Sequence, residues 1–150
     1  MSFRPPLRLK LDSEALTTNW NTMATLSGKA QTGAAVKADA YGLGARAVVP
    51  ILWNAGCRDF FVAHWEEAEA LTDLIPTSRI AVLNGITEED VSAVVELGAI
   101  PVLNTPHQIA LWKEAKGGLC HVMLDSGINR LGIGPEQMTP ELFAGLGIDI

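Results

Sequence analysis

Short apolar runs alternate with amphipathic segments along the sequence, at a spacing of roughly 20 to 25 residues. The apolar runs predict strands, and these are expected at 33–38, 59–64, 80–83, 100–103, 119–124 and 148–150. Residues 7–11, which alternate apolar and basic side chains, are expected to form one more, half-buried strand. Helices are expected between them, at 13–28, 46–55, 66–76, 87–98, 105–117 and 140–144. Regular alternation of this kind predicts βα units and a parallel sheet.

Nearly every expected strand ends in a polar residue that can carry chemistry. The residues are Lys37, Asp39, His64, Asn84, Asn104 and Asp125. An open doubly wound sheet gathers its ligand groups at one switch point, whereas a (β/α)8 barrel brings all its strand ends to one mouth. The even distribution favours the TIM-type barrel. A full barrel takes about 250 residues, so these 150 residues are expected to form its first five to six βα units.

Composition restricts the class of partner. The net charge of −6 and the pI near 4.9 argue against nucleic acid and anionic membrane. No apolar run reaches the length of a membrane span, and no signal peptide is recognisable, so a cytoplasmic location is expected. Cys57 and Cys120 are expected to be free thiols. The histidines are too scattered for a metal site.

The stretch 34–44 combines a lysine with an apolar strand and two glycines. Burying an ammonium group without a partner is strongly unfavourable. Lys37 can pair with Asp39 or point outward, or it can lose its charge covalently. A desolvated lysine can form a Schiff base with a carbonyl, including the aldehyde of pyridoxal phosphate.

The glycines allow a second interpretation of the same stretch. The segment 42–47 fits the dinucleotide fingerprint G-x-G-x-x-G/A, which predicts a nucleotide-binding site on Gly42 and Gly44. The first glycine of that fingerprint should follow its strand directly, but three residues, 39–41, intervene. Tyr41 is also placed to donate its hydroxyl to a phosphate, because it lies just past the expected end of the strand.

Ala34 to Gly44 closely resembles the cofactor-lysine motif of the alanine racemases, which are pyridoxal-phosphate enzymes. The match is nearly continuous, so the resemblance favours the Schiff-base interpretation of Lys37. It implies that Tyr41 contacts the phosphate of the cofactor. Residues 61–68 are also similar to the second strand and helix start of that family, and the resemblance covers nearly the whole chain.

A second motif occupies the loop 125–132, read as Asp-Ser-Gly-Ile-Asn-Arg-Leu-Gly. From residue type alone, Arg130 is a surface arginine or a partner of Asp125. The loop resembles a similar segment of the alanine racemases, which implies that Arg130 contacts the phenolic oxygen of the cofactor and the carboxylate of the substrate. Many family members carry a carbamylated lysine where this chain has Met123, so another group must orient Arg130 or its placement is looser. His121 should share a strand face with Met123.

The resemblance implies racemisation of L-alanine and D-alanine through a Lys37 Schiff base and an α-carbanion, which supplies D-alanine for peptidoglycan. It also implies that residues 1–12 form a strand that belongs with a second, C-terminal β domain. The partial barrel then occupies 13–150. In the family, a tyrosine handles the proton on the opposite face of the substrate from the lysine, and this tyrosine comes from the second domain of a partner subunit. The full-length chain is therefore expected to be a homodimer. The 150 residues alone are expected to have little or no activity.

Three alternatives stay open at this point. A broader amino acid racemase or a pyridoxal-phosphate carrier protein can be built on the same barrel. A nucleotide-binding α/β domain can use the two glycines at 42 and 44. A purely structural piece without a ligand is the third, because the site is incomplete.

Overall fold

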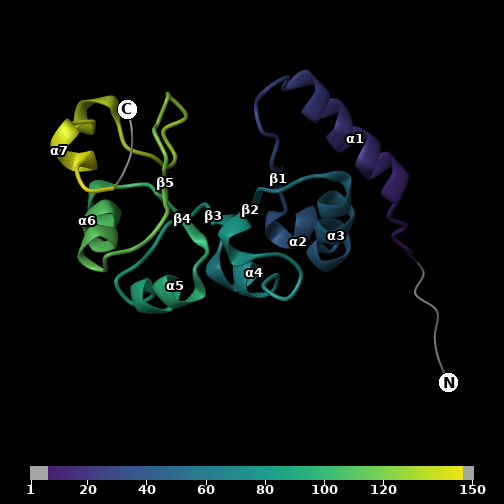
Figure 1. Cartoon of the computed structure of the whole chain (residues 1–150), viewed down its shortest axis with the longest axis horizontal. Coiled ribbons are helices and arrows are strands. Elements are labelled where there is room, and N and C mark those ends of the chain that lie inside the picture. The colour runs from purple at the N-terminus through teal and green to yellow at the C-terminus, as the bar shows by residue number, and fades with distance from the viewer. Residues whose placement is uncertain (1–6, 147–150) are drawn as a thin grey trace.

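The computed structural model describes residues 7–146, which form an arc of parallel strands (Figure 1). The strands are β1 (Ala34–Ala35), β2 (Phe60–Val62), β3 (Ile80–Val82), β4 (Ile100–Leu103) and β5 (His121–Val122). They pair in chain order, β1-β2-β3-β4-β5, and every pairing is parallel. A doubly wound sheet needs a reversal of strand order. The uninterrupted order within the described residues therefore confirms a segment of a barrel.

The helices are α1 (Ser13–Leu26), α2 (Lys37–Tyr41), α3 (Ala45–Ala55), α4 (Trp65–Glu69), α5 (Val91–Leu97), α6 (Pro106–Glu114) and α7 (Pro140–Phe143). Helices α2 to α6 connect successive strands, whereas α1 precedes β1 and α7 follows β5. Two short 3₁₀ turns complete the elements, η1 (Thr77–Arg79) and η2 (Pro135–Gln137). In Figure 1, α3, α4, α5 and α6 follow one side of the strand arc.

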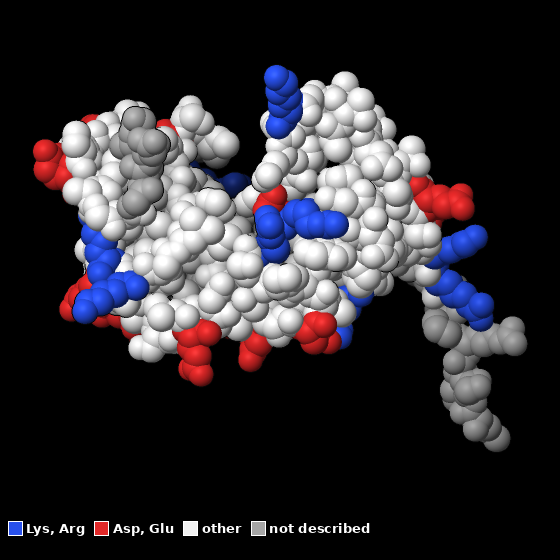
Figure 2. All heavy atoms as spheres, in the orientation of Figure 1, with Lys and Arg blue, Asp and Glu red and all other residues white. Residues whose placement is uncertain are grey.

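Alternate strand residues pack on opposite faces of the sheet. Phe60, Val62 and Val82 pack against helical residues in the largest apolar cluster. A separate cluster is built on the strand residues Ala81, Ile100 and Val102, with Phe61 of β2 and with Leu83 and Met123, which directly follow β3 and β5, packed against them. This second face corresponds to the inside of a barrel, and no helix packs on it within the described residues. Figure 2 shows a hollow on this side of the molecule and acidic side chains along the helical side.

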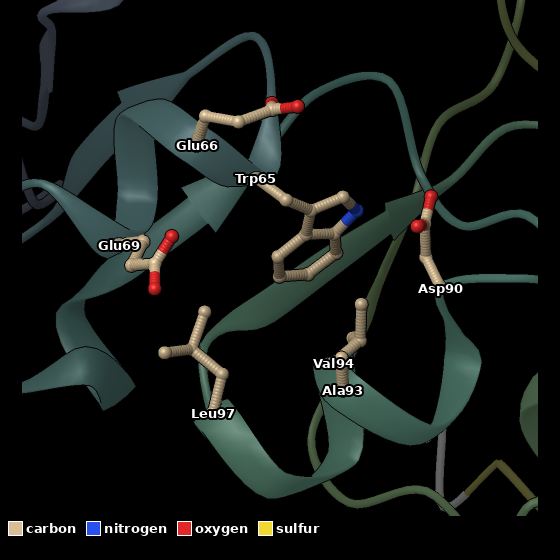
Figure 3. A pocket seen from close by; sticks show the side chains of 7 residues that line it. All are labelled: Trp65, Glu66, Glu69, Asp90, Ala93, Val94 and Leu97. Carbon is tan, nitrogen blue, oxygen red and sulfur yellow. The ribbon is translucent and has the colours of Figure 1, made fainter.

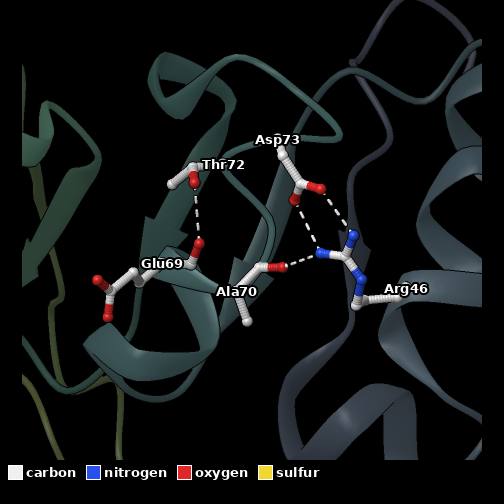
Figure 4. A network of polar contacts seen from close by, with 5 residues as sticks. All are labelled: Arg46, Glu69, Ala70, Thr72 and Asp73. Atoms are coloured by element: carbon white, nitrogen blue, oxygen red, sulfur yellow. Dashed lines mark hydrogen bonds and ion pairs between the residues drawn. The ribbon is translucent and has the colours of Figure 1, made fainter.

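Capping signals place several helices where the sequence predicts them. The Thr105 hydroxyl accepts a hydrogen bond from the Gln108 backbone N–H at 3.1 Å, and Pro106 opens α6. Asp12 caps α1 by accepting from the N–H groups of Glu14 and Ala15. The helix α3 is tied to the turn after α4 by a bidentate ion pair between Arg46 and Asp73, both contacts being 2.7 Å (Figure 4).

Three expectations about strands need correction or fall outside the structure. The strand expected at 33–38 ends at Ala35, because the backbone turns sharply at Lys37. Residues 7–11 form no strand: they pair with no other strand in the described part of the chain, and Leu7 and Leu9 are exposed. The strand expected at 148–150 lies outside the described residues, as does half of the 1–12 segment.

Candidate functional site

The turn that follows β1 carries Lys37 and has an unusual backbone. The φ angles of Ala38, Asp39, Ala40 and Tyr41 lie between 50° and 55°, so α2 is a left-handed turn. This conformation costs roughly 1–2 kcal/mol for each residue that has a Cβ. Backbone strain of this kind is concentrated at functional sites and persists only where the surrounding structure holds it.

Two carboxylates hold the turn in place. Asp39 accepts a hydrogen bond at 2.7 Å from the Ala45 backbone N–H, which fixes the start of α3. Glu67, at the start of α4, accepts one at 2.6 Å from the Ala38 N–H, directly after Lys37. Asp39 is therefore engaged with the backbone, and the alternative in which Lys37 pairs with Asp39 is not observed.

Lys37 itself is half-buried and lies on the turn, whereas the sequence predicted a lysine buried within a strand. The side-chain hydrogen bonds and ion pairs found across residues 7–146 leave its ammonium without a partner. Tyr41 ends the same turn and is 65% exposed, so its hydroxyl is accessible. The structure thus places an accessible amine and a phenol on one rigid turn at the end of β1.

A chain of hydrogen bonds joins the ends of the next strands. The Asn84 amide contacts His64 Nδ1 at 3.1 Å, which links β3 to β2. Gln108 accepts from the Asn104 backbone N–H at 2.7 Å and donates to the Asn84 carbonyl at 3.3 Å. Of the predicted strand-end polar residues, His64, Asn84 and Asn104 are therefore linked along one edge of the sheet, from β2 to β4.

Arg130 lies on the loop after β5, at the opposite end of the strand order from Lys37. The loop is shaped by Asp125, whose carboxylate accepts from the N–H groups of Gly127 at 2.9 Å and Asn129 at 3.0 Å. These backbone hydrogen bonds lower the pKa of Asp125. Asp125 does not pair with Arg130, and Arg130 is exposed. No hydrogen bond in the described residues joins Arg130 to Lys37 or Tyr41.

Met123 faces the inside of the strand arc, where it packs against Ala81, Ile100 and Val102. His121 is paired in register with Val102, so it shares that face with Met123, as the alternation predicts. The position where many members of the family carry a carbamylated lysine is thus an apolar contact in this chain.

The glycine pair at 42 and 44 does not follow a strand directly. The whole of α2 separates β1 from Gly42, and Gly44 precedes α3 with a φ of 91°. A dinucleotide site needs the first glycine immediately after the strand. The geometry of this turn therefore does not fit the fingerprint.

A groove of about 210 Å³ lies between α4 and α5 (Figure 3). It is lined by Trp65, Glu66, Glu69, Asp90, Ala93, Val94 and Leu97. None of the predicted site residues contributes to it. No cluster of three or more metal-ligating side chains occurs among residues 7–146. Over the same residues, no helix has both the length and the apolar character that a membrane crossing requires.

Glu67 and Gln108 are the residues linking neighbouring strand ends that sequence reasoning missed. The sequence places both near helix starts, where such residues commonly cap the helix. Their second role is to contact the neighbouring strand end, 29 and 24 residues away in sequence. An acidic or amide residue at the third position of both α4 and α6 was the available signal.

The strand order and the uncovered inner face define a partial (β/α)8 barrel, with Lys37 at a strand end. The family described as "Alanine racemase, N-terminal domain" matches residues 11–147. The chain belongs to this family.

Known relatives agree with this assignment. An alanine racemase of Methylobacterium nodulans is 41% identical over 135 residues, covering 87% of this chain and 36% of the relative. A catabolic alanine racemase of Agrobacterium fabrum is 43% identical over 136 residues, covering 87% of this chain and 35% of the relative. The chain therefore spans little more than a third of the length of these relatives.

A solved structure of alanine racemase from Bartonella henselae, with covalently bound pyridoxal phosphate, superimposes with a TM-score of 0.77. It is 35% identical in sequence, and the match covers 84% of this chain and 38% of that chain. The similarity confirms the barrel fold predicted from the alternation of strands and helices.

Proposed function

We propose that this chain provides the cofactor-bearing part of a pyridoxal-phosphate-dependent alanine racemase. The observation that carries the proposal is the accessible Lys37 amine on a rigid turn at the mouth of a partial barrel. The related Bartonella henselae structure, which has covalently bound pyridoxal phosphate, supports the choice of cofactor.

The residues at the strand ends suit this cofactor chemically. Lys37 offers an amine for its aldehyde carbon, Tyr41 a hydroxyl for its phosphate, and Arg130 a guanidinium for its phenolic oxygen. When bound, pyridoxal phosphate supplies a conjugated ring that accepts electrons from the α carbon of an amino acid.

Each residue has a defined task in racemisation. Lys37 Nζ holds the cofactor and, once released by an incoming amino acid, moves the proton at the α carbon on one face of the substrate. Arg130 binds the carboxylate of the substrate and so orients the α carbon toward that amine. With Met123 packed against apolar neighbours, the position of Arg130 depends on its own loop, which Asp125 shapes.

Further parts of the proposal rest on the family. We expect the product D-alanine to enter peptidoglycan, the location to be cytoplasmic and the assembly to be a homodimer. A residue outside this chain handles the second face of the substrate, so the 150 residues alone should show little or no racemisation in a direct assay.

The cofactor assignment is tested by titrating the chain with pyridoxal phosphate and recording its visible absorption spectrum. The unmodified chain should develop the absorption band of a lysine-bound cofactor, and Lys37→Ala should not. Lys29→Ala, which removes an exposed lysine elsewhere, is the control and should behave like the unmodified chain. An equal band in Lys37→Ala would contradict the assignment.

A further inference from the structure

Glu67 connects the Lys37 turn to the neighbouring strand through a single carboxylate. Its Oε1 accepts from the Ala38 N–H at 2.6 Å. Its Oε2 accepts from the N–H groups of Ala63 at 2.7 Å and His64 at 3.2 Å. One side chain of α4 thus holds both the turn after β1 and the end of β2.

The bond to Ala38 acts directly on Lys37. The N–H of Ala38 belongs to the same planar peptide group as the carbonyl of Lys37. Fixing that N–H therefore fixes the orientation of the peptide that leaves Lys37, and with it the direction in which the lysine side chain departs. Ala38 is exposed and lies in the left-handed region, with a φ of 50°, so the local sequence does not hold this orientation by itself.

The chemistry of the contact requires a carboxylate. All three of its partners are N–H donors, and an ionised carboxylate is purely an acceptor. Gln108 makes the equivalent link between β4 and β3, but one of its partners is the Asn84 carbonyl. An amide, which both donates and accepts, fits that second link, and so each position carries the side chain that its partners need.

Partial burial raises the pKa of Glu67, but hydrogen bonds from the Ala63, Ala38 and His64 N–H groups outweigh it, so the pKa is lowered overall. The group is therefore ionised at neutral pH, as an acceptor of three N–H bonds should be.

We propose that Glu67 is a positioning residue, which orients Lys37 for bonding to pyridoxal phosphate through the Ala38 N–H. This inference rests on the proposed function, since it assumes that Lys37 bonds that cofactor. Glu67 acts through the backbone and contacts neither cofactor nor substrate.

The test compares three variants of similar size. Glu67→Gln replaces one acceptor oxygen by an NH2 group, which cannot accept a hydrogen bond. Gln108→Glu disturbs the equivalent link between β3 and β4, away from Lys37. Glu66→Gln removes the charge of an exposed neighbour on the same helix. Each variant is mixed with pyridoxal phosphate, reduced with borohydride at successive times, and digested so that the adduct on Lys37 is measured by mass spectrometry.

Glu67→Gln should slow formation of the Lys37 adduct roughly tenfold, the factor that one hydrogen bond to a charged group represents. The two control variants should stay within about twofold of the unmodified chain, a margin smaller than the effect of one such bond. If the unmodified chain forms the adduct and Glu67→Gln forms it equally fast, the role of Glu67 is refuted while the proposed function stands. If the unmodified chain forms no adduct, the proposed function itself fails.

A second measurement needs neither cofactor nor variant. In the unmodified chain, the Ala38 amide should exchange its hydrogen as slowly as the Ala63 amide, because both donate to Glu67. Ala38 is exposed, so without that bond its exchange would be fast. Rapid exchange at Ala38 alone would overturn the proposal even if Glu67→Gln fails to fold.

Discussion

At the scale of single residues, the site depends on polar groups that hold backbone in conformations it would not adopt alone. Glu67 does this for Ala38, and Asp125 does it for the loop that carries Arg130. In each case a carboxylate accepts several N–H groups, which lowers its pKa. Because these carboxylates bind backbone N–H groups, they do not pair with Lys37 or Arg130, the two side chains proposed to bind cofactor and substrate.

The Arg130 loop closes tightly at Gly132. A Cβ added there would lie 2.7 Å from the Asp125 backbone nitrogen, and the φ of 112° disfavours any other residue. We expect Gly132→Ala to lower the free energy of unfolding by about 1–3 kcal/mol, because both clash and backbone strain must be relieved. The measurement is the urea-unfolding midpoint. Gly118→Ala, where an added Cβ meets nothing within 4 Å, is the control, and an equal loss in both would contradict the argument.

At the scale of elements, periodicity and capping predicted most of the architecture. The positions of β2, β3 and β4 follow from apolar runs, and the start of α6 follows from its cap Thr105, because these signals are local. The left-handed turn at Ala38–Tyr41 has no local signal, since alanine does not favour that region. It is held by Glu67, 29 residues away from Ala38, and a contact that distant cannot be read from a single sequence.

The strand expected at 7–11 is not formed in the described residues, and this too depends on a contact that a local pattern does not show. An alternating pattern indicates that a segment can pair, but it does not supply the partner. In the described residues Leu7 and Leu9 meet no neighbouring strand. The predicted membership of this segment in a second domain stays a prediction.

The strand β4 should contribute strongly to stability. Leu103 is 0% exposed and packs among the residues that cover the helical face of β4 and β5. Leu103→Ala should lower the free energy of unfolding by about 2–5 kcal/mol through lost burial and a residual cavity. Leu119→Ala, at a leucine 69% exposed, should change it by less than about 0.5 kcal/mol. Thermal unfolding of both variants checks this difference.

At the scale of the whole molecule, the fold should be sensitive to acid. The pKa values of Glu67, Asp73 and Asp125 are all lowered in the folded chain, and the Arg46 hydrogen bond is the main cause at Asp73. Lowered carboxyl pKa values stabilise the fold above their unfolded values, and this stabilisation is lost as pH falls through the folded values. The melting temperature should therefore be level from neutral pH to about pH 5 and fall below that.

The acid sensitivity can be assigned to particular groups. Glu67→Gln and Asp73→Asn each remove one of the three carboxylates, so each should make the fall in melting temperature below about pH 5 shallower. Melting curves recorded across this range test the assignment. A profile that is unchanged in both variants would show that other carboxyl groups cause the acid response.

The central claim is that Lys37, among the five lysines of the sequence, bonds pyridoxal phosphate. The most direct measurement is borohydride reduction of the chain mixed with the cofactor, followed by mapping of every lysine-containing peptide. The amine condenses with the aldehyde with loss of water, and hydride from the borohydride fixes the bond. We predict that the adduct lies on Lys37, with Lys10, Lys29, Lys113 and Lys116 essentially unmodified. An adduct spread evenly over all the lysines, or one that leaves out Lys37, would contradict the account.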